Sequence, residues 1–111
     1  MQPSKSLQSN DFFIKNGKDH VRVNPDEILW VEAQGNYLAL KTETARYFIY
    51  GSMRSIEKLL PSGKFVRASR SYIVALEKIT EINGKTLKIN GHNVPMSIPC
   101  RQLLLKRVTI L

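Results

Sequence analysis

The sequence contains little cysteine and histidine and no long hydrophobic run, and each absence excludes a class of protein. A single cysteine, Cys100, excludes an internal disulfide framework and a cysteine-based metal site. No apolar run approaches the roughly 18 residues that a membrane span needs. Residues 1–10 are polar and lack the apolar core of a signal peptide. These absences predict a soluble cytoplasmic protein.

Length and composition predict one compact domain. The 111 residues suffice for a single hydrophobic core but not for two. Hydrophobic residues make up 42% and charged residues 23%, as in ordinary globular proteins. Residues 1–10 contain Pro and Ser without hydrophobic periodicity, which is typical of a linker. We therefore expect a linker or disordered lead at 1–10 and one domain over 11–111.

Acidic residues are scarce in the second half of the chain. Residues 1–61 carry 8 Lys and Arg against 7 Asp and Glu, whereas residues 62–111 carry 9 against 2. No acidic side chain follows Glu81. A basic surface of this kind favours an anionic partner, either nucleic acid, an acidic membrane surface or an acidic protein. The alternative is a solvated basic surface that only maintains solubility.

Turn residues divide the chain into short strands. Asn-Gly occurs at 16–17, 83–84 and 90–91, and this dipeptide favours tight hairpins because both residues tolerate positive φ. The expected strands cover 12–15, 20–24, 28–32, 37–41, 45–49, 65–67, 73–76, 79–82, 86–89 and 94–96.

Two segments have the features of short helices, because Ser52 and Ser97 are suitable N-caps for helices over 53–60 and 99–108. The fold class is therefore mainly β, with antiparallel strands and one or two short helices. The expected core-facing helical residues are Ile56, Leu59, Leu60, Leu103, Leu104 and Val108.

No residues show the spacing of a catalytic or metal site. His20 and His92 lie in different hairpins without neighbouring ligands. Cys100 has no histidine nearby in sequence to act as a base, so a small buried thiol is the expected role. No glycine-rich phosphate-binding motif is present. We expect no enzymatic activity, no cofactor and no metal.

Three stretches together resemble one known family. They are Ile28–Tyr37 (ILWVEAQGNY), Phe65–Val74 (FVRASRSYIV) after Leu59-Leu60-Pro61, and Leu87 followed by Val94–Ser97 (VPMS). In order and spacing they resemble the LytTR family of DNA-binding domains, over about Phe12 to Arg107. The middle stretch is the most specific of the three.

The resemblance implies an elongated β fold whose loops, rather than a recognition helix, enter the grooves of double-stranded DNA. It implies a sequence-specific output domain in transcription regulation, placed behind a receiver domain in bacterial response regulators of two-component systems. Paired DNA repeats, and possible homodimers on them, are the implied partners, with no role for a membrane.

The resemblance also assigns base contacts to Asn36, Arg70 and Arg101. Asn suits a bidentate pair with adenine, and Arg suits guanine O6 and N7. Each has an alternative: Asn36 as a positive-φ turn residue, Arg70 as a structural ion-pair partner, and Arg101 as a cover for its own helix. The expected DNA-backbone contacts are Tyr37, Lys64, Ser69, Ser71, Lys85 and Lys88.

The chain departs from the family pattern at three places. Ser69 stands where many members have His, Ala75 stands where Asn is usual, and Ile98-Pro99-Cys100 replaces basic residues. The third of these departures lies immediately before Arg101, the third expected base contact.

Two other functions are compatible with a small basic β domain. One is a protein- or membrane-interaction domain without sequence-specific DNA binding. The other is an RNA-binding β-barrel, which would need exposed aromatic side chains to stack on bases. The strand pattern instead predicts core positions for most aromatics, namely Phe12, Phe13, Trp30, Phe48 and Phe65.

Overall fold

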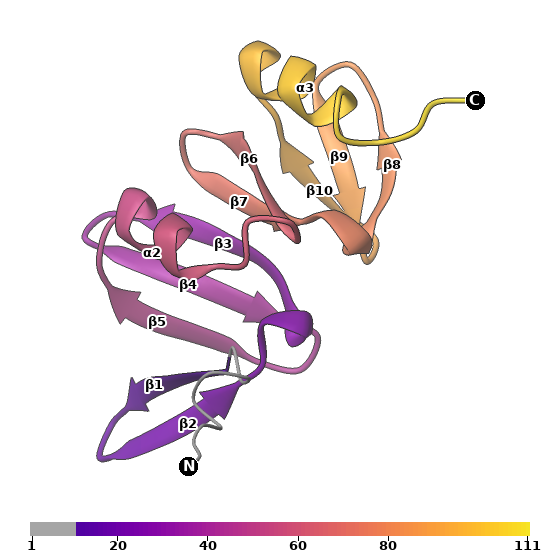
Figure 1. The fold of residues 1–111 in the computed structure, drawn as a ribbon. Coiled ribbons are helices and arrows are strands. Elements are labelled where there is room, and N and C mark those ends of the chain that lie inside the picture. Colours follow the sequence, from indigo (N-terminus) through magenta and orange to yellow (C-terminus); the bar gives the residue numbers. More distant parts are fainter. Residues whose placement is uncertain (1–10) are drawn as a thin grey trace.

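The computed structural model describes residues 11–111, and the expected lead segment at 1–10 lies outside the described part of the chain. The described residues form three antiparallel sheets and two short α-helices (Figure 1). The molecule measures 44 × 33 × 24 Å. This confirms the prediction of an elongated, mainly β fold. No helix in the described range is long and apolar enough to cross a membrane.

A five-stranded sheet forms the centre of the molecule. Its strand order is β5-β4-β3-β7-β6, and every neighbouring pair is antiparallel. Its strands are β3 (Ile28–Gln34), β4 (Tyr37–Thr42), β5 (Arg46–Tyr50), β6 (Phe65–Ser69) and β7 (Tyr72–Ala75).

Two smaller sheets flank the central sheet, one at each end of the molecule (Figure 1). The other elements are β1 (Phe12–Asn16), β2 (Asp19–Val23), β8 (Ile79–Ile82), β9 (Thr86–Ile89), β10 (His92–Pro95), α2 (Met53–Leu59), α3 (Ile98–Leu105) and 3-10 turns at Pro25–Glu27 and Leu76–Lys78.

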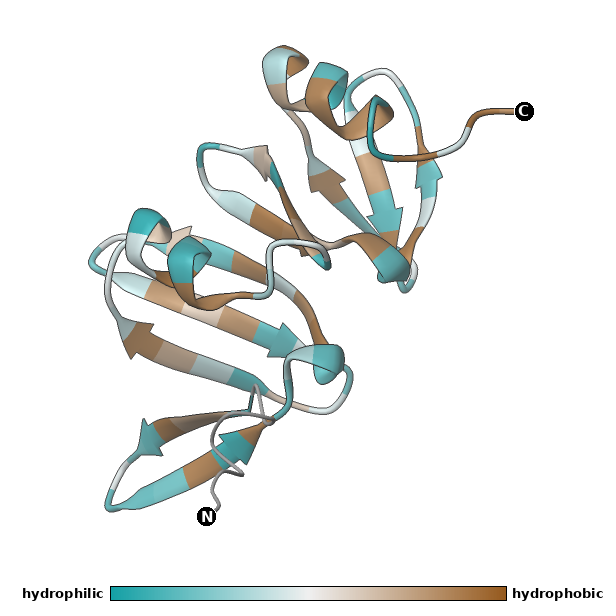
Figure 2. Cartoon of the chain, viewed as in Figure 1, coloured by the Kyte–Doolittle hydropathy of each residue, from teal (hydrophilic) through white to brown (hydrophobic). Residues whose placement is uncertain are grey.

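The buried residues form two hydrophobic clusters. The first joins the hairpin β1–β2 and helix α2 to the central sheet, through residues such as Ile14, Met53 and Ile56. The second joins strands β6 and β7 to β9, β10 and α3. Its centre includes Leu87 and Leu104, which are both fully buried. Hydrophobic residues accordingly concentrate within the strands, and the connections between them are mostly hydrophilic (Figure 2).

One of the three Asn-Gly turns agrees fully with the sequence, because Asn90-Gly91 connects β9 to β10 with positive φ at both residues. Asn83-Gly84 lies between β8 and β9 as predicted, but the connection is 83–85 and neither Asn83 nor Gly84 has positive φ. The prediction at Asn16-Gly17 is wrong by one residue, because the turn is Gly17-Lys18. The predicted turn would place Ile14 opposite Asp19, whereas the observed register places Ile14 opposite Val21. Apolar pairing therefore determines this register.

The two predicted N-caps are confirmed. The Ser52 hydroxyl accepts a hydrogen bond from the Ser55 amide, and the Ser97 hydroxyl accepts one from the Cys100 amide. Two of the predicted core residues are wrong, because Leu59 and Leu103 are 65% and 59% exposed. Each helix is short and buries a narrow face.

Two aromatic residues also differ from the prediction. Phe13 and Phe48 are exposed rather than core-directed, and the guanidinium groups of Arg22 and Arg46 lie over their rings. Both side chains project from a face of their strand that the rest of the described chain leaves uncovered. Alternation along a strand identifies its two faces but not which face is covered.

Candidate functional site

Four connections follow one another along the left and upper edge of the molecule in Figure 1. They are the β3–β4 turn (Gly35-Asn36), the β6–β7 turn (Arg70-Ser71), the β8–β9 turn (83–85) and the first turn of α3 (97–101). Backbone hydrogen bonds link three of the elements in a row: the Ser97 amide donates to Ala68, and the Met96 amide donates to Lys85. We call this set of four connections the loop edge.

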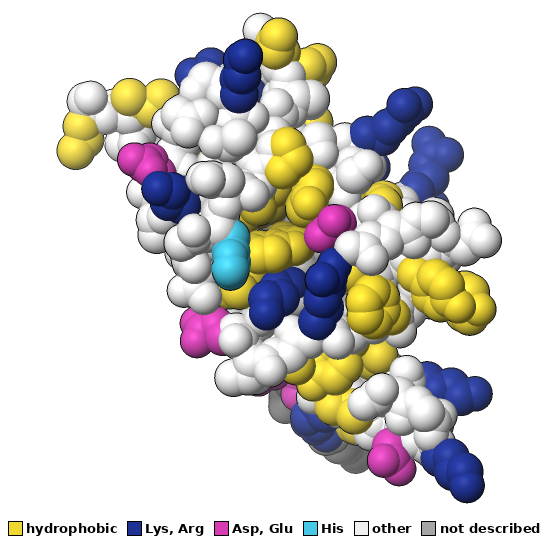
Figure 3. Space-filling model, turned by 180° about the vertical axis from the view of Figure 1, so that it is seen from behind, with side chains coloured by type: hydrophobic (Ala, Val, Ile, Leu, Met, Phe, Trp, Pro, Cys, Tyr) yellow, Lys and Arg dark blue, Asp and Glu magenta, His cyan; other side chains and the backbone are white. Residues whose placement is uncertain are grey.

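Strand direction explains why the loop edge forms. Antiparallel neighbours place alternate connections at the same end of a sheet, and β3–β4 and β6–β7 both turn at the end where β3 finishes. The Ala33 amide donates to the Ser71 carbonyl at 2.9 Å, which joins these two turns directly. Figure 3 views the molecule from behind, so the β3–β4 and β6–β7 turns, at the left of Figure 1, lie on its right side, where Lys and Arg side chains project.

The β6–β7 turn presents Arg70. A bulge at Ala68 interrupts the ladder between Arg67 and Ser69, and bulges of this kind change the direction of the following residues. The Arg70 side chain is exposed. Within residues 11–111 its guanidinium makes no hydrogen bond or ion pair, so the structural ion pair considered above is absent.

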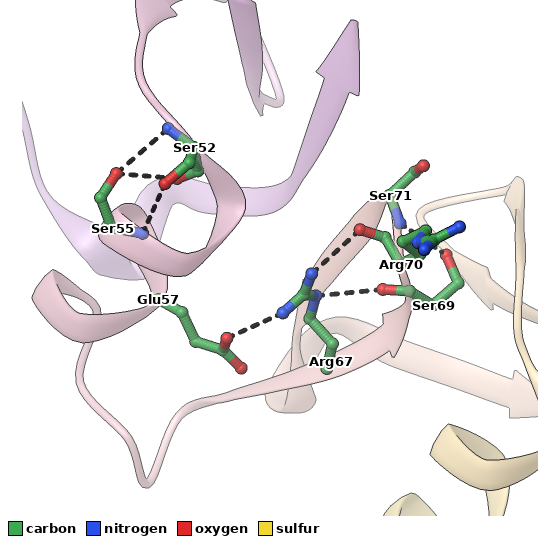
Figure 4. Close-up of polar contacts among 7 residues, drawn as sticks. All are labelled: Ser52, Ser55, Glu57, Arg67, Ser69, Arg70 and Ser71. Carbon is green, nitrogen blue, oxygen red and sulfur yellow. Dashed lines mark hydrogen bonds and ion pairs between the residues drawn. The ribbon is translucent and has the colours of Figure 1, made fainter.

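The guanidinium of Arg67 contacts the backbone of the β6–β7 turn (Figure 4). Its Nε donates to the Ser69 carbonyl and its Nη2 donates to the Arg70 carbonyl, each at 3.0 Å. Its Nη1 pairs with Glu57 Oε1 at 2.8 Å. The Ser69 hydroxyl also accepts from the Ser71 amide at 3.2 Å. The Arg70 side chain points away from Arg67 (Figure 4).

The β3–β4 turn presents Asn36. Gly35 has a φ of 59°, whereas Asn90 is the one non-glycine residue with positive φ in the described range. The turn therefore does not use Asn36 for a left-handed conformation. Next to it, Tyr37 stacks on Tyr50 with ring centroids 4.4 Å apart, and their hydroxyls lie 2.7 Å apart. This hydrogen bond raises the pKa of Tyr37, so its phenol is neutral at physiological pH.

Arg101 lies in the first turn of α3. Its Nε donates to the Asn83 carbonyl at 3.1 Å, and the residue is partly buried. Arg101 therefore fastens α3 to the β8–β9 turn, in addition to any contact that its other nitrogens make. Asn83 also stabilises its own turn by accepting hydrogen bonds from the backbone of Lys85 and Thr86.

The six expected DNA-backbone residues do not all lie together. Tyr37, Ser69, Ser71 and Lys85 belong to the loop edge or adjoin it. Lys64 precedes β6 and so lies at the opposite end of that strand from the β6–β7 turn. A five-residue strand separates its two ends by about 15 Å. Its ammonium pairs with Asp26 at 2.8 Å, and this hydrogen bond and charge raise its pKa. Lys88 lies within β9 and pairs with Glu81 at 3.4 Å.

Sequence reasoning missed Arg67 and Tyr50. Arg67 alternates with apolar neighbours in β6, so it resembled an ordinary strand residue. Its signal was its position immediately before a polar corner, where a long donor reaches carbonyls of the next turn. Tyr50 gave no signal, because its partner Tyr37 is thirteen residues away and becomes a neighbour through the β4–β5 register.

The histidines and Cys100 occupy separate places. His92 packs edge-on against Trp30 with ring centroids 5.4 Å apart, and Cys100 is a partly buried free thiol. In the part of the chain that the structure describes, no group of three or more His, Cys, Asp or Glu is placed to hold a metal ion.

Known proteins resemble this chain in both sequence and structure. Residues 18–108 match the family model of the LytTr DNA-binding domain. The sensory transduction protein LytT of Enterococcus faecalis is 33% identical over 88 residues, and the match covers 73% of this chain but 36% of that protein. A solved LytTr DNA-binding domain, from a putative methyl-accepting/DNA response regulator of Bacillus cereus, superposes with a TM-score of 0.77 at 24% identity. That match covers 87% of this chain and 94% of the solved one.

Proposed function

The chain belongs to the LytTR family of DNA-binding domains, and from this we propose that its loop edge recognises specific sequences in double-stranded DNA. The chain spans about a third of the length of the curated relative that it matches. We therefore propose further that it is the output domain of a bacterial transcriptional regulator. In that protein, a receiver domain precedes this segment, and two copies bind paired repeats.

The observation that carries the proposal is the presentation of Arg70. Its guanidinium is exposed and has no partner among the described residues. The turn beneath it is held by hydrogen bonds to its carbonyls. A fixed backbone with a free guanidinium suits two parallel hydrogen bonds to guanine in the major groove.

Asn36 and Arg101 extend the same surface in both directions. Asn36 lies on an adjacent two-residue turn and pairs with adenine in this proposal. Arg101 already uses its Nε on the Asn83 carbonyl, so its Nη nitrogens remain for a base or a phosphate. Tyr37, Ser69, Ser71 and Lys85 bind phosphates and set the register of the domain on the duplex.

The test uses a duplex selected from a random library by the protein. Arg70→Ala should lower affinity for that duplex by about 5- to 150-fold and relax preference at one base pair. Arg22→Ala is a matched control, because Arg22 is exposed on β2 and pairs with Asp11 away from the loop edge. Anisotropy titrations on the selected duplex and its single-base-pair variants measure both effects.

Two outcomes would contradict the proposal. If Arg70→Ala weakened all duplexes equally, Arg70 would contact phosphate rather than a base. If single-stranded RNA bound more tightly than any duplex, the exposed aromatics Phe13 and Phe48 would favour base stacking as the function. Anionic vesicles serve as a third ligand, because net charge alone would promote binding to them.

A further inference from the structure

The guanidinium of Arg67 is held between the turn that carries Arg70 and helix α2. Each of its three nitrogens donates one hydrogen bond within the protein, to the carbonyls of Ser69 and Arg70 and to the carboxylate of Glu57. Its side chain is 30% exposed. Two of its five N–H groups remain, but turning the guanidinium toward DNA would break the three bonds that it makes. We propose that Arg67 is a positioning residue for Arg70. This inference rests on the function proposed above.

The bulge lies beside the carbonyls that Arg67 binds. At Ala68 the ladder between β6 and β7 skips a residue, immediately before the chain turns. The Ser69 and Arg70 carbonyls accept from Arg67, and the Ser71 carbonyl accepts from Ala33 of β3. All three carbonyls of the turn are thereby satisfied, which fixes the direction in which the Arg70 side chain leaves the backbone.

The geometry requires arginine. A planar guanidinium donates in several fixed directions at once, and here two nitrogens face the turn while the third faces Glu57. Lysine keeps the charge but offers one nitrogen, which cannot reach both carbonyls and Glu57 in the same geometry.

Glu57 accepts the third hydrogen bond of the Arg67 guanidinium. It lies on α2, whose N-terminus is fixed by reciprocal hydrogen bonds between Ser52 and Ser55 (Figure 4). Met53 and Ile56 bury the same helix against the central sheet. The turn that carries Arg70 is thus connected, through Arg67 and Glu57, to a packed helix.

The experiment compares base discrimination rather than affinity alone. Discrimination is the ratio of dissociation constants for the selected duplex and for the duplex changed at the base pair that Arg70→Ala identifies. Arg70→Ala should lower discrimination by about 5- to 150-fold, and Arg67→Lys should reproduce a large part of that loss. The slope of log affinity against log salt should stay unchanged in Arg67→Lys. In the double variant with Arg70→Ala, Arg67→Lys should have no further effect on this ratio.

Arg22→Lys is the matched control, because Arg22 also pairs with a carboxylate, Asp11, at 2.9 Å, and it should leave discrimination unchanged. Glu57→Ala is the second variant, which leaves Arg67 in place and should reduce discrimination in the same direction. Thermal melts establish that each variant is folded, and Glu57→Ala decides the matter if Arg67→Lys is not.

The result has two clear readings. Loss of discrimination that disappears in the Arg70→Ala background supports the positioning role. Unchanged discrimination, or equal weakening on every duplex, overturns it. If Arg70→Ala itself leaves discrimination unchanged, the proposed function fails; if only the Arg67 and Glu57 variants do so, the function stands and this inference alone fails.

Discussion

Two lysines with the same expected role should respond differently to salt, because only one of them lies on the loop edge. Lys85 is exposed in the β8–β9 turn, and its ammonium has no partner in the described range. Lys64 lies at the far end of β6 and pairs with Asp26 at 2.8 Å. We therefore expect Lys85→Ala to weaken DNA binding at low salt and Lys64→Ala to leave it nearly unchanged.

The magnitude follows from counterion release. Each phosphate neutralised contributes about −0.9 to the slope of log affinity against log salt, so Lys85→Ala should reduce the slope by about that amount. Between about 50 and 200 mM salt, the penalty of Lys85→Ala should shrink by about 3.5-fold. The penalty should be the same on the selected duplex and on a scrambled one, because a phosphate contact carries no sequence information.

Fluorescence anisotropy at four or more salt concentrations measures these slopes. Asp26→Asn serves as a control that releases Lys64 from its ion pair. The slope should still not change, since Lys64 remains away from the loop edge. A reduction of the slope by Lys64→Ala equal to that of Lys85→Ala would refute the placement of the DNA on this edge.

Three further predictions concern stability. Leu104→Ala should cost about 2–5 kcal/mol of unfolding free energy, because Leu104 is fully buried. The exposed Leu103 is the control, and Leu103→Ala should cost less than about 1 kcal/mol. Equal costs in urea denaturation would contradict the packing of α3. Gly35→Ala should cost roughly 1–2 kcal/mol through the positive φ of 59°, with Gly63→Ala as the control that lacks this constraint. Burial, and then the charge of Glu32, raise the pKa of Tyr72 above 10, so its neutral form stabilises the fold below pH 10 and stability falls as pH rises through the raised pKa. Tyr72→Phe should lessen that fall in melting temperature, and identical pH curves for both proteins would contradict it.

Local chemistry made much of the fold predictable. Asn90-Gly91 adopts positive φ at both residues, and Ser52 and Ser97 cap their helices, because these effects act within a few residues. The Gly17-Lys18 turn was missed because its register depends on pairing Ile14 with Val21 across the whole hairpin. Phe48 was misplaced because the pattern of β5 does not indicate which of its faces is left uncovered.

The candidate site was predictable only in part. Asn36, Arg70 and Arg101 were assigned through the family resemblance, and the structure brings their three connections to one edge. Their contacts with DNA remain a proposal. Sequence periodicity does not show where a strand ends, so it did not separate Lys64 from Arg70. It also does not show the bulge in β6 beside which Arg67 donates to the turn.

The shortness of the turns has an evolutionary consequence. Asn36 and Arg70 each lie on a two-residue turn flanked by paired strands, so neither turn has room to lengthen without disturbing the register. If Asn36 and Arg70 read bases as proposed, a relative that binds a different operator should differ by side-chain replacement at these positions, with the length of the turn preserved. Such a change leaves the buried clusters untouched, and new DNA targets can arise from point mutations in a duplicated copy.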